Sequence, residues 1–333
     1  MIALRTLVIS GYGIKLGVKK GCIVIKDRDK TREVSPSDLD QIIIATSGVL
    51  MSSKFLRLLT NYGVDLVVLD SRGYPISRFY HPYITKTIDS RLAQYLSYLN
   101  GLAKEVAKVI AYCKLMNQAS YLLRLSRSLG ANELKESAYA IESLANEILR
   151  VNSEDLHALR KDLINIEAHG ARIYWSSITY VLPNDLGFKG RDQDGNDLVN
   201  ISLNYGYGLI YSECWKAAVL AGLDPYAGFL HTERSGRPVL TYDLIEMFRA
   251  VAVDSVIISM ARSGWRGEIK GGLLSHKSRA EIIKAISENL EKRFRSKRSE
   301  SHMTLRQWIR HSALDIANSL IGCRKPKGFI VRW

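Results

Sequence analysis

The feature that most constrains the fold is a change in hydrophobic periodicity near residue 87. Before it, short β-branched and aromatic runs are separated by glycine turns, a pattern typical of strands. After it, apolar residues recur every three to four positions over stretches too long for strands, which indicates helices. The sequence therefore predicts an α+β protein with a small β-rich domain at 1–86, including one helix, and a larger all-helical domain at 87–333.

The β-rich part contains predicted strands on both sides of its one predicted helix. Ser52 or Ser53 can cap this helix, and Gly63 can end it in the left-handed conformation. The apolar runs at 42–44 and 66–69 are expected either to pair in a core or to serve a dimer interface. The strands are expected at 6–10, 14–16, 22–26, 41–45, 65–70 and 75–79.

The helical part begins after a predicted linker formed by Pro82 and the polar run at 85–90. One long helix, capped by Asp89 or Ser90, is expected to follow and to continue as far as the break at Gly130.

Two further helices have clear signals. Ser153 is expected to cap a helix that stops before Pro183, because the residue before proline disfavours helical geometry. Residues 277–298 predict a single basic amphipathic helix.

The charge distribution points to a polyanionic partner. The formal net charge of the chain is +14. Residues 262–333 hold 17 Lys/Arg against 6 Asp/Glu, a net of +11, whereas residues 87–261 have a net of −3. Such a basic region suits nucleic acid. The alternative is the highly charged, solvated surface of a thermophilic protein. Membrane-surface binding is disfavoured, because the basic helices keep core-like apolar faces.

The N-terminus and the cysteines predict a cytoplasmic protein without a membrane span. Arg5 interrupts the first apolar run and no small-residue cleavage site follows it, so no signal peptide is expected. Every window of about 20 residues carries charge. The four cysteines form no CxxC pair, which argues against a zinc site and for a reducing compartment.

The most suggestive chemistry lies between residues 224 and 254. His231 precedes a Gly/Pro loop, and Asp243 and Glu246 follow on one helix face because they are three residues apart. An imidazole with two carboxylates suits a divalent metal. The alternative is a helix start whose dipole favours acids in the first turn. Asp254 lies about 16 Å further along the helix from Asp243 and is expected to be a structural acid.

Glu167 is a second unusual acid, because it shares an apolar helix face with Leu163 and Tyr174. A buried carboxylate needs a partner, since burying an unpaired charge costs several kcal/mol. Two explanations remain open from the residues alone. Glu167 could pair with an arginine such as Arg160 or Arg172, or it could bind a metal.

Four segments in this order resemble a known family, the CRISPR-associated integrase/endonuclease that acquires new spacers together with a small partner nuclease. The segments are NIEAHGARIYW around Glu167, FKGRDQDGNDLVNISLNYGYGLI from Phe188, DPYAGFLH ending at His231, and TYDLIEMFRAVAVD from Thr241. The β-rich layout followed by helices matches too, so the resemblance covers essentially the whole chain.

The resemblance implies a metal site and a reaction. Its metal ligands fall on Glu167, His231 and Glu246, with Mg²⁺ or Mn²⁺ as the metal. Asp243 would lie beside the metal as a further catalytic acid. Attack by a DNA 3′-hydroxyl would give strand transfer, and attack by water would give nicking or cleavage. The resemblance also implies a homodimer paired through residues 1–86 and a small companion CRISPR-associated nuclease.

The expected nucleic-acid partner is double-stranded or branched DNA, or DNA with free 3′ ends. Basic side chains would hold its phosphates, which position a strand without reading its sequence. The candidates are Arg191, Arg234, Arg237, Lys292, Arg293, Arg295, Lys297 and Arg298.

Two other functions remain open at this stage. One is a non-catalytic, architectural DNA-binding subunit in which Glu167 and Glu246 merely pair with arginines. The other is a related integrase of a mobile element, which would share the site but not the CRISPR context.

Overall fold

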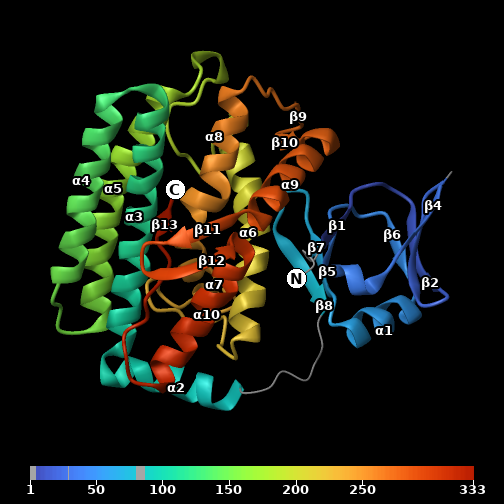
Figure 1. Cartoon of the computed structure of the whole chain (residues 1–333), viewed down its shortest axis with the longest axis horizontal. Coiled ribbons are helices and arrows are strands. Elements are labelled where there is room, and N and C mark those ends of the chain that lie inside the picture. Colours follow the sequence, from blue (N-terminus) through green and yellow to red (C-terminus); the bar gives the residue numbers. More distant parts are fainter. Residues whose placement is uncertain (1–4, 29, 80–86) are drawn as a thin grey trace.

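The computed structural model describes residues 5–28, 30–79 and 87–333. Figure 1 shows a β-rich part beside a larger, mostly helical part, which confirms the predicted α+β organisation. The predicted linker at Pro82 and 85–86 lies outside the described residues. Residues 87–90, which the same prediction included, begin a helix instead.

The β-rich part is built from two four-stranded sheets. The first has the order β1-β5-β7-β8 and the second the order β4-β3-β2-β6. In the first sheet β1, β5 and β7 run parallel, and β8 pairs antiparallel to β7. The strands are Arg5–Ile9 (β1), Ile14–Lys19 (β2), Cys22–Lys26 (β3), Thr31–Val34 (β4), Leu39–Ile44 (β5), Val49–Met51 (β6), Asp65–Leu69 (β7) and Pro75–Phe79 (β8).

The central strands of the first sheet are buried on both faces. Ile42 and Leu66 point into the core of the β-rich part. Their neighbours Ile43 and Val67 point the other way and join the core of the helical part. Successive strand side chains alternate between faces, so a continuous apolar run is what a doubly covered sheet requires. The two runs therefore pair in a core, one of the two predicted outcomes.

The single helix of this part, α1 (Ser53–Tyr62), begins and ends where the sequence predicted. The Ser52 hydroxyl accepts a hydrogen bond from the Phe55 amide at 3.2 Å, which caps the first turn. Gly63 adopts the left-handed conformation with a φ of 66°, which ends the helix.

The helical part differs from the prediction at its start. The expected long helix is two helices, because Gly101 takes a φ of 84° and breaks it. A glycine adopts this conformation readily, and the following helix starts in a new direction. The main helices are Thr87–Asn100 (α2), Leu102–Leu129 (α3), Asn132–Arg150 (α4), Leu156–Val181 (α5), Leu198–Leu220 (α6), Val239–Glu246 (α7), Ser255–Arg262 (α8), His276–Glu291 (α9) and Leu305–Ile321 (α10).

The cap of α5 is Asp155, not the predicted Ser153. The Asp155 carboxylate accepts a hydrogen bond from the Ala158 amide at 2.8 Å. The Ser153 hydroxyl instead donates to the Asp162 carboxylate at 2.7 Å. The predicted stop is confirmed, since α5 ends at Val181.

The prediction of an all-helical second domain is wrong near the C-terminus. Helix α9 ends at Glu291, and the sequence Arg293–Ser296 forms strand β11. Its side chains alternate between exposed and buried, and buried Phe294 packs against Trp333 with ring centroids 5.6 Å apart. The small strands are Ile269–Lys270 (β9), Leu273–Leu274 (β10), Arg293–Ser296 (β11), Ser299–Thr304 (β12) and Val331–Arg332 (β13).

Helix α6 lies at the centre of the molecule and is buried almost all round. Helices α3, α4 and α5 stand side by side on one flank of the helical part (Figure 1). The first sheet packs against the other flank, where β8 contacts α6. Among residues 5–28, 30–79 and 87–333, no helix is long and apolar enough to cross a membrane.

A buried ion-pair cluster joins the sheet to α6. Asp65 on β7 accepts hydrogen bonds from Arg78 at 2.9 Å and lies 3.5 Å from the ammonium of Lys216. Arg78 also donates to the backbone oxygen of Ser212 at 2.6 Å. One carboxylate thus neutralises two largely buried cations that come from different parts of the fold.

Replacing this carboxylate should destabilise the protein strongly. In Asp65→Asn both Arg78 and Lys216 lose their buried counter-charge, and we expect a loss of about 3–5 kcal/mol in the free energy of unfolding. Glu33→Gln is the matched control, because Glu33 pairs with exposed Lys19 and should change stability by less than about 1 kcal/mol. Denaturant unfolding of the three proteins measures both values. Equal stability of the two variants would contradict the assignment.

Candidate active site

Two carboxylates that are distant in sequence meet at one ammonium group. Glu167 comes from α5, Glu246 from the last residue of α7, and Lys114 from α3. The Lys114 Nζ lies 3.1 Å from Glu167 Oε1 and 2.9 Å from Glu246 Oε2. Glu167 and Glu246 are 7% and 5% exposed, so both charges lie inside the protein. The predicted arginine partners of Glu167 were wrong: its ion-pair partner is a lysine.

The two carboxylate oxygens that face the ammonium are otherwise unsatisfied. Glu167 Oε1 and Glu246 Oε2 are buried, and neither is in a well-aligned hydrogen bond with the described residues. Buried acceptors are normally hydrogen-bonded, because leaving one unpaired costs about 1–3 kcal/mol. Two buried carboxylates that share a single cation in this way therefore indicate a candidate functional site.

The two glutamates differ in how firmly their charge is held. Burial raises the pKa of Glu246, yet the charges of Arg249 and Lys114 outweigh it and lower that pKa to about 2. Arg249 lies one turn further along and contacts Glu246 Oε1 at 3.0 Å. Burial raises the pKa of Glu167, and the charge of Glu246 adds to this rise, so the lowering by Lys114 does not outweigh them. Glu246 is thus the firmly ionised member of the pair.

His231 is held by Asp243 through one ring nitrogen. The His231 Nδ1 lies 2.7 Å from Asp243 Oδ1, in a carboxylate–imidazole hydrogen bond. The partly exposed imidazole presents Nε2 as its other ring nitrogen. Burial lowers the pKa of His231, but the hydrogen bond and charge of Asp243, with the charges of Glu246 and Glu167, raise it above its usual value. His231 therefore lies within electrostatic range of both glutamates.

Asp243 is fully buried and organises the backbone around the histidine. Its carboxylate accepts hydrogen bonds from the amides of Phe229, Leu230 and His231, at 2.5, 3.0 and 3.0 Å. These three bonds and the imidazole contact occupy both of its oxygens. The structure thus places Asp243 behind His231, as the group that orients it.

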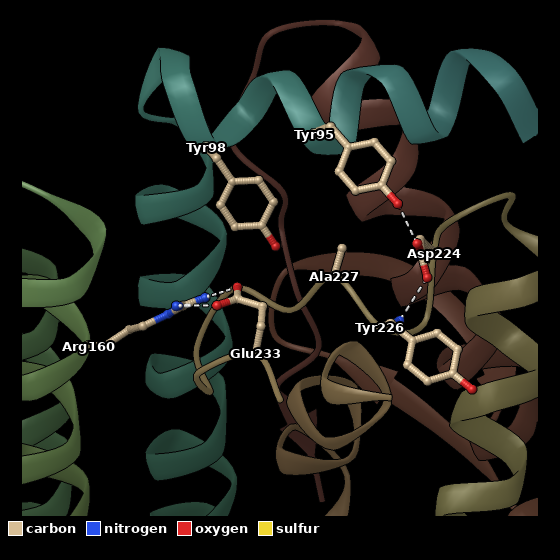
Figure 2. Close-up of a pocket in the computed structure, with 7 residues that line it drawn as sticks. All are labelled: Tyr95, Tyr98, Arg160, Asp224, Tyr226, Ala227 and Glu233. Carbon is tan, nitrogen blue, oxygen red and sulfur yellow. Dashed lines mark hydrogen bonds and ion pairs between the residues drawn. The ribbon is translucent and has the colours of Figure 1, made fainter. Parts of the chain in front are cut away.

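The backbone that leads to His231 is held from its other side by α2 and α5, as Figure 2 shows. Arg160 donates to the carbonyl oxygens of Phe229 and Gly228 at 2.8 and 3.0 Å, and its bidentate partner is Glu233 at 2.6 and 2.9 Å. Tyr98 donates to the Gly228 oxygen at 2.5 Å. The histidine is therefore fixed by contacts on both faces of its loop.

A cavity of about 430 Å³ opens beside these contacts. Its walls include Tyr95 on α2 and Tyr226 on the loop. The Tyr95 hydroxyl and the Tyr226 backbone amide both donate to the Asp224 carboxylate (Figure 2). The Gln94 side chain donates to the backbone oxygen of Asp224 at 3.0 Å and accepts from the Asp224 amide at 2.8 Å. This side of the loop therefore serves to hold it in place.

Asp254 is a structural acid, as the sequence predicted. It is buried in η3, a π-helical turn at Ala250–Asp254 that follows α7. The hydroxyls of Tyr174 and Tyr207 donate to its two oxygens at 3.0 and 2.6 Å. This arrangement links the segment after Glu246 to α5 and α6.

The residues present fit a divalent metal in part. The unsatisfied glutamate oxygens are hard ligands that converge on one cation, and an imidazole fixed through Nδ1 by a carboxylate is the usual form of a metal-binding histidine. As the side chains stand, no group of three His, Cys, Asp or Glu among the described residues is close enough to hold an ion. The Lys114 ammonium occupies the position between the glutamates.

Six of the eight predicted DNA-binding residues are exposed, and they lie in two places. Arg234 and Arg237 are on the loop that follows His231, and the other four exposed residues lie at or beside β11. These are Lys292, Arg293, Arg295 and Lys297.

Two other candidates are engaged within the protein. Arg191 donates to the side-chain oxygens of Asn200 and Asn204 at 2.9 and 2.5 Å. Arg298 lies over the ring of Tyr112, 4.8 Å from its centroid. Their role in DNA binding stays a prediction, and their contacts favour a structural role.

Lys114 and Arg249 did not enter the sequence prediction. The sequence contains one indication of a buried ion pair for each of them. Lys114 is the single charged residue in the apolar run 109–123, and Arg249 is three residues from Glu246. A charge in an apolar helical run requires a buried partner, and an i,i+3 spacing supplies one. The sequence does not say which acid meets Lys114, because the partners lie on other helices.

Comparison with known proteins assigns the chain to a family. The family described as CRISPR associated protein Cas1 matches residues 7–288. A CRISPR-associated endonuclease Cas1 from Saccharolobus solfataricus is 36% identical over 330 residues, which is 99% of both chains. A casposase bound to its integration product has a TM-score of 0.82 at 25% identity, covering 96% of this chain and 92% of that one. A chain of a Cas6-RT-Cas1–Cas2 complex has the same fold, with a TM-score of 0.75 at 18% identity, covering 99% of this chain and 36% of that one.

The fold and these similarities define a CRISPR-associated protein of the nuclease and integrase class. Within this class the match over residues 7–288 is decisive: the chain belongs to the Cas1 family.

The structure predicts that Asp243 sets the protonation of His231. In Asp243→Asn the pKa of His231 should fall, because the charge and the strong hydrogen bond that raise it are lost. In the wild type the raised pKa means that this pair stabilises the fold fully below the unfolded pKa of histidine. The stabilisation is lost as the pH rises through the folded pKa.

Imidazole NMR titration of histidine-labelled protein measures this shift. Asp194→Asn, which removes the same charge from an exposed loop, is the control and should leave His231 unchanged. A His231 pKa in Asp243→Asn equal to or above the wild-type value would rule out the orienting role.

Proposed function

We propose that this protein is a divalent-metal-dependent DNA endonuclease and integrase. It inserts short DNA fragments as new spacers into a CRISPR array by attack of a 3′-hydroxyl on a phosphodiester, and it can also nick or cleave DNA. The observation that carries this proposal is the convergence of two buried carboxylates, Glu167 and Glu246, on one cation position. Bringing two buried like charges to one position costs stability, so their convergence favours a functional role.

Glu167, Glu246 and the Nε2 of His231 would hold the metal, Mg²⁺ or Mn²⁺. When bound, such an ion stabilises the charge that develops on a phosphodiester and helps to activate a hydroxyl. The hard carboxylate oxygens favour these ions, and the hydrogen bond from His231 Nδ1 to Asp243 fixes the tautomer that leaves Nε2 available.

The chain's own residues prepare the site for this reaction. Arg249 keeps Glu246 ionised, and Asp243 keeps the imidazole in one orientation. Burial of the two glutamates limits access of water, which strengthens electrostatic interactions at the reacting phosphate. Because phosphoryl transfer depends mainly on positioning and electrostatics, no covalent nucleophile from the protein is required.

DNA would reach the site along the exposed basic surface. Arg234 and Arg237 follow His231 directly and are solvent-exposed, so they can meet the phosphates next to the reacting one. Arg293 and Arg295 lie on the same exposed face of β11, because residues two apart on a strand point the same way.

Partners are also part of the proposal. The similarity to a chain of a Cas6-RT-Cas1–Cas2 complex supports a small companion protein of the Cas2 type. A homodimer paired through the β-rich part is supported by edge strand β6, where Leu50 is 67% exposed and Met51 39% exposed. An apolar edge strand tends to pair with another chain.

An integrase of a mobile element is the second candidate, and the similarity to the casposase favours it. Both candidates require the same strand-transfer chemistry, so the gene neighbourhood separates them. A non-catalytic DNA-binding subunit is disfavoured, because Glu167 and Glu246 lie at one cation position and Glu167 pairs with no arginine in the described part of the chain.

Removing a proposed ligand should abolish the chemistry. In Glu246→Ala, strand transfer and cleavage should fall by about 10²–10³-fold or more, because charge stabilisation at the phosphate is lost. The assay uses short duplex DNA with free 3′ ends and a repeat-bearing target, with Mg²⁺ or Mn²⁺. Glu147→Gln, on the exposed face of α4, is the control. Full activity of a folded Glu246→Ala protein would exclude the proposed site.

DNA binding should be strongly salt-dependent, because neutralised phosphates release counterions. In the double variant Arg293→Gln/Arg295→Gln, the slope of log affinity against log salt should decrease by about 2. Lys26→Gln/Arg32→Gln removes the same charge from the outer sheet of the β-rich part and should leave the slope unchanged. Fluorescence anisotropy over a salt series measures it, and equal slopes for the two double variants would refute the assignment of β11.

A further inference from the structure

Lys114 is a charged residue in a largely buried position, and its ion-pair partners there are Glu167 and Glu246. It is the one charged residue between 109 and 123, on a helix that is otherwise buried among apolar side chains. Its ammonium lies 3.1 Å from Glu167 Oε1 and 2.9 Å from Glu246 Oε2. Bringing a lysine into such a position removes it from water, which requires a strong electrostatic compensation.

A positive charge between the two glutamates stabilises them. Two buried carboxylates repel each other, and Arg249 contacts only the Oε1 side of Glu246. The Lys114 side chain reaches the shared position from α3 on a flexible stem, and it is still 20% exposed. The side chain as a whole is therefore not sealed from solvent.

We propose that Lys114 is a tethered counter-ion, which occupies the cation position between Glu167 and Glu246 until a divalent metal displaces it. This inference rests on the proposed metal-dependent function, and it adds a positioning residue to that function. The lysine keeps the two carboxylates assembled when no metal is bound. In return, it competes with the metal for the same two oxygens.

Competition between the ammonium and the metal predicts the direction in which the metal affinity changes when Lys114 is replaced. If the ammonium must leave before the metal binds, removing it raises the metal affinity of the site. A residue that helped to hold the metal, or one with a purely structural role, would have the opposite effect or none.

The test compares Mn²⁺ binding by Lys114→Met with that of the full-length wild type, without DNA. Methionine keeps the length and the apolar stem but removes the charge. The concentration of free Mn²⁺ is measured by electron paramagnetic resonance at mildly alkaline pH. We expect Lys114→Met to bind Mn²⁺ tighter by about tenfold, which corresponds to roughly 1.4 kcal/mol.

The matched control is Lys108→Met. Lys108 lies on the same helix, is similarly buried and pairs with Glu105 at 4.0 Å, away from the two glutamates. This variant reduces the net charge by the same amount and should bind Mn²⁺ as the wild type does. It separates a local competition from a general attraction of the less basic chain for cations.

A thermal scan gives a second readout that is independent of activity. Without metal, Lys114→Met should melt below Lys108→Met, because two buried carboxylates lose their shared counter-ion. Saturating Mn²⁺ should raise its melting temperature more than that of the wild type, since tighter binding stabilises more at equal metal concentration. If Lys114→Met does not fold, Lys114→Gln takes its place, as it removes the charge but retains hydrogen-bond donors.

The outcomes separate the two proposals. Equal or weaker Mn²⁺ binding by the Lys114 variants, with normal binding by the wild type, would overturn the counter-ion role alone. Absence of Mn²⁺ binding by the wild type, matched by Glu246→Ala, would overturn the metal site and the counter-ion role together. Tighter binding by the Lys114 variants, with an unchanged Lys108 control, establishes the displacement.

Discussion

The interaction on which the site depends is the contact of one ammonium with two buried carboxylates. It joins α3, α5 and α7, whose residues 114, 167 and 246 are far apart in the chain. Neither glutamate is stable alone in this interior, because an uncompensated buried charge is costly. The three helices must therefore keep their relative positions, and other contacts serve that end. Asn117, one turn beyond Lys114, donates to the oxygen of Met247 at 2.7 Å, directly after Glu246.

The histidine belongs to a separate, equally fixed unit. The Asp243 carboxylate accepts hydrogen bonds from three backbone amides and bonds to the imidazole, so one buried carboxylate holds both the loop and the ring. Arg160 and Tyr98 hold the same loop from its outer face. A loop held in this way keeps the imidazole in one orientation, and such preorganisation favours electrostatic catalysis. The sequence grouped Asp243 with Glu246 because both share a helix face, and the structure gives them different tasks.

Much of the fold could be predicted where a short segment decides it. The cap at Ser52 and the left-handed Gly63 depend on neighbours a few residues away, and both were predicted. The break at Gly101 was missed, because an isolated glycine within a helical pattern is often tolerated. Strand β11 was missed as well. It pairs with β12 in a local hairpin, but its other neighbour in the sheet, β13, lies about 35 residues further along the chain, so the three-stranded sheet is not a local property.

The sequence by itself determined the two-part organisation, the burial of Glu167, and the family motifs that contain Glu167, His231 and Glu246. These follow from periodicity and from residue types at fixed spacing, which each segment carries independently. The tertiary structure decided which charges meet: Lys114 lies between the glutamates, Arg160 holds the histidine loop, and Asp243 lies behind His231. Helical periodicity tells which face of a helix is buried, but the partner across that face depends on how the helices pack.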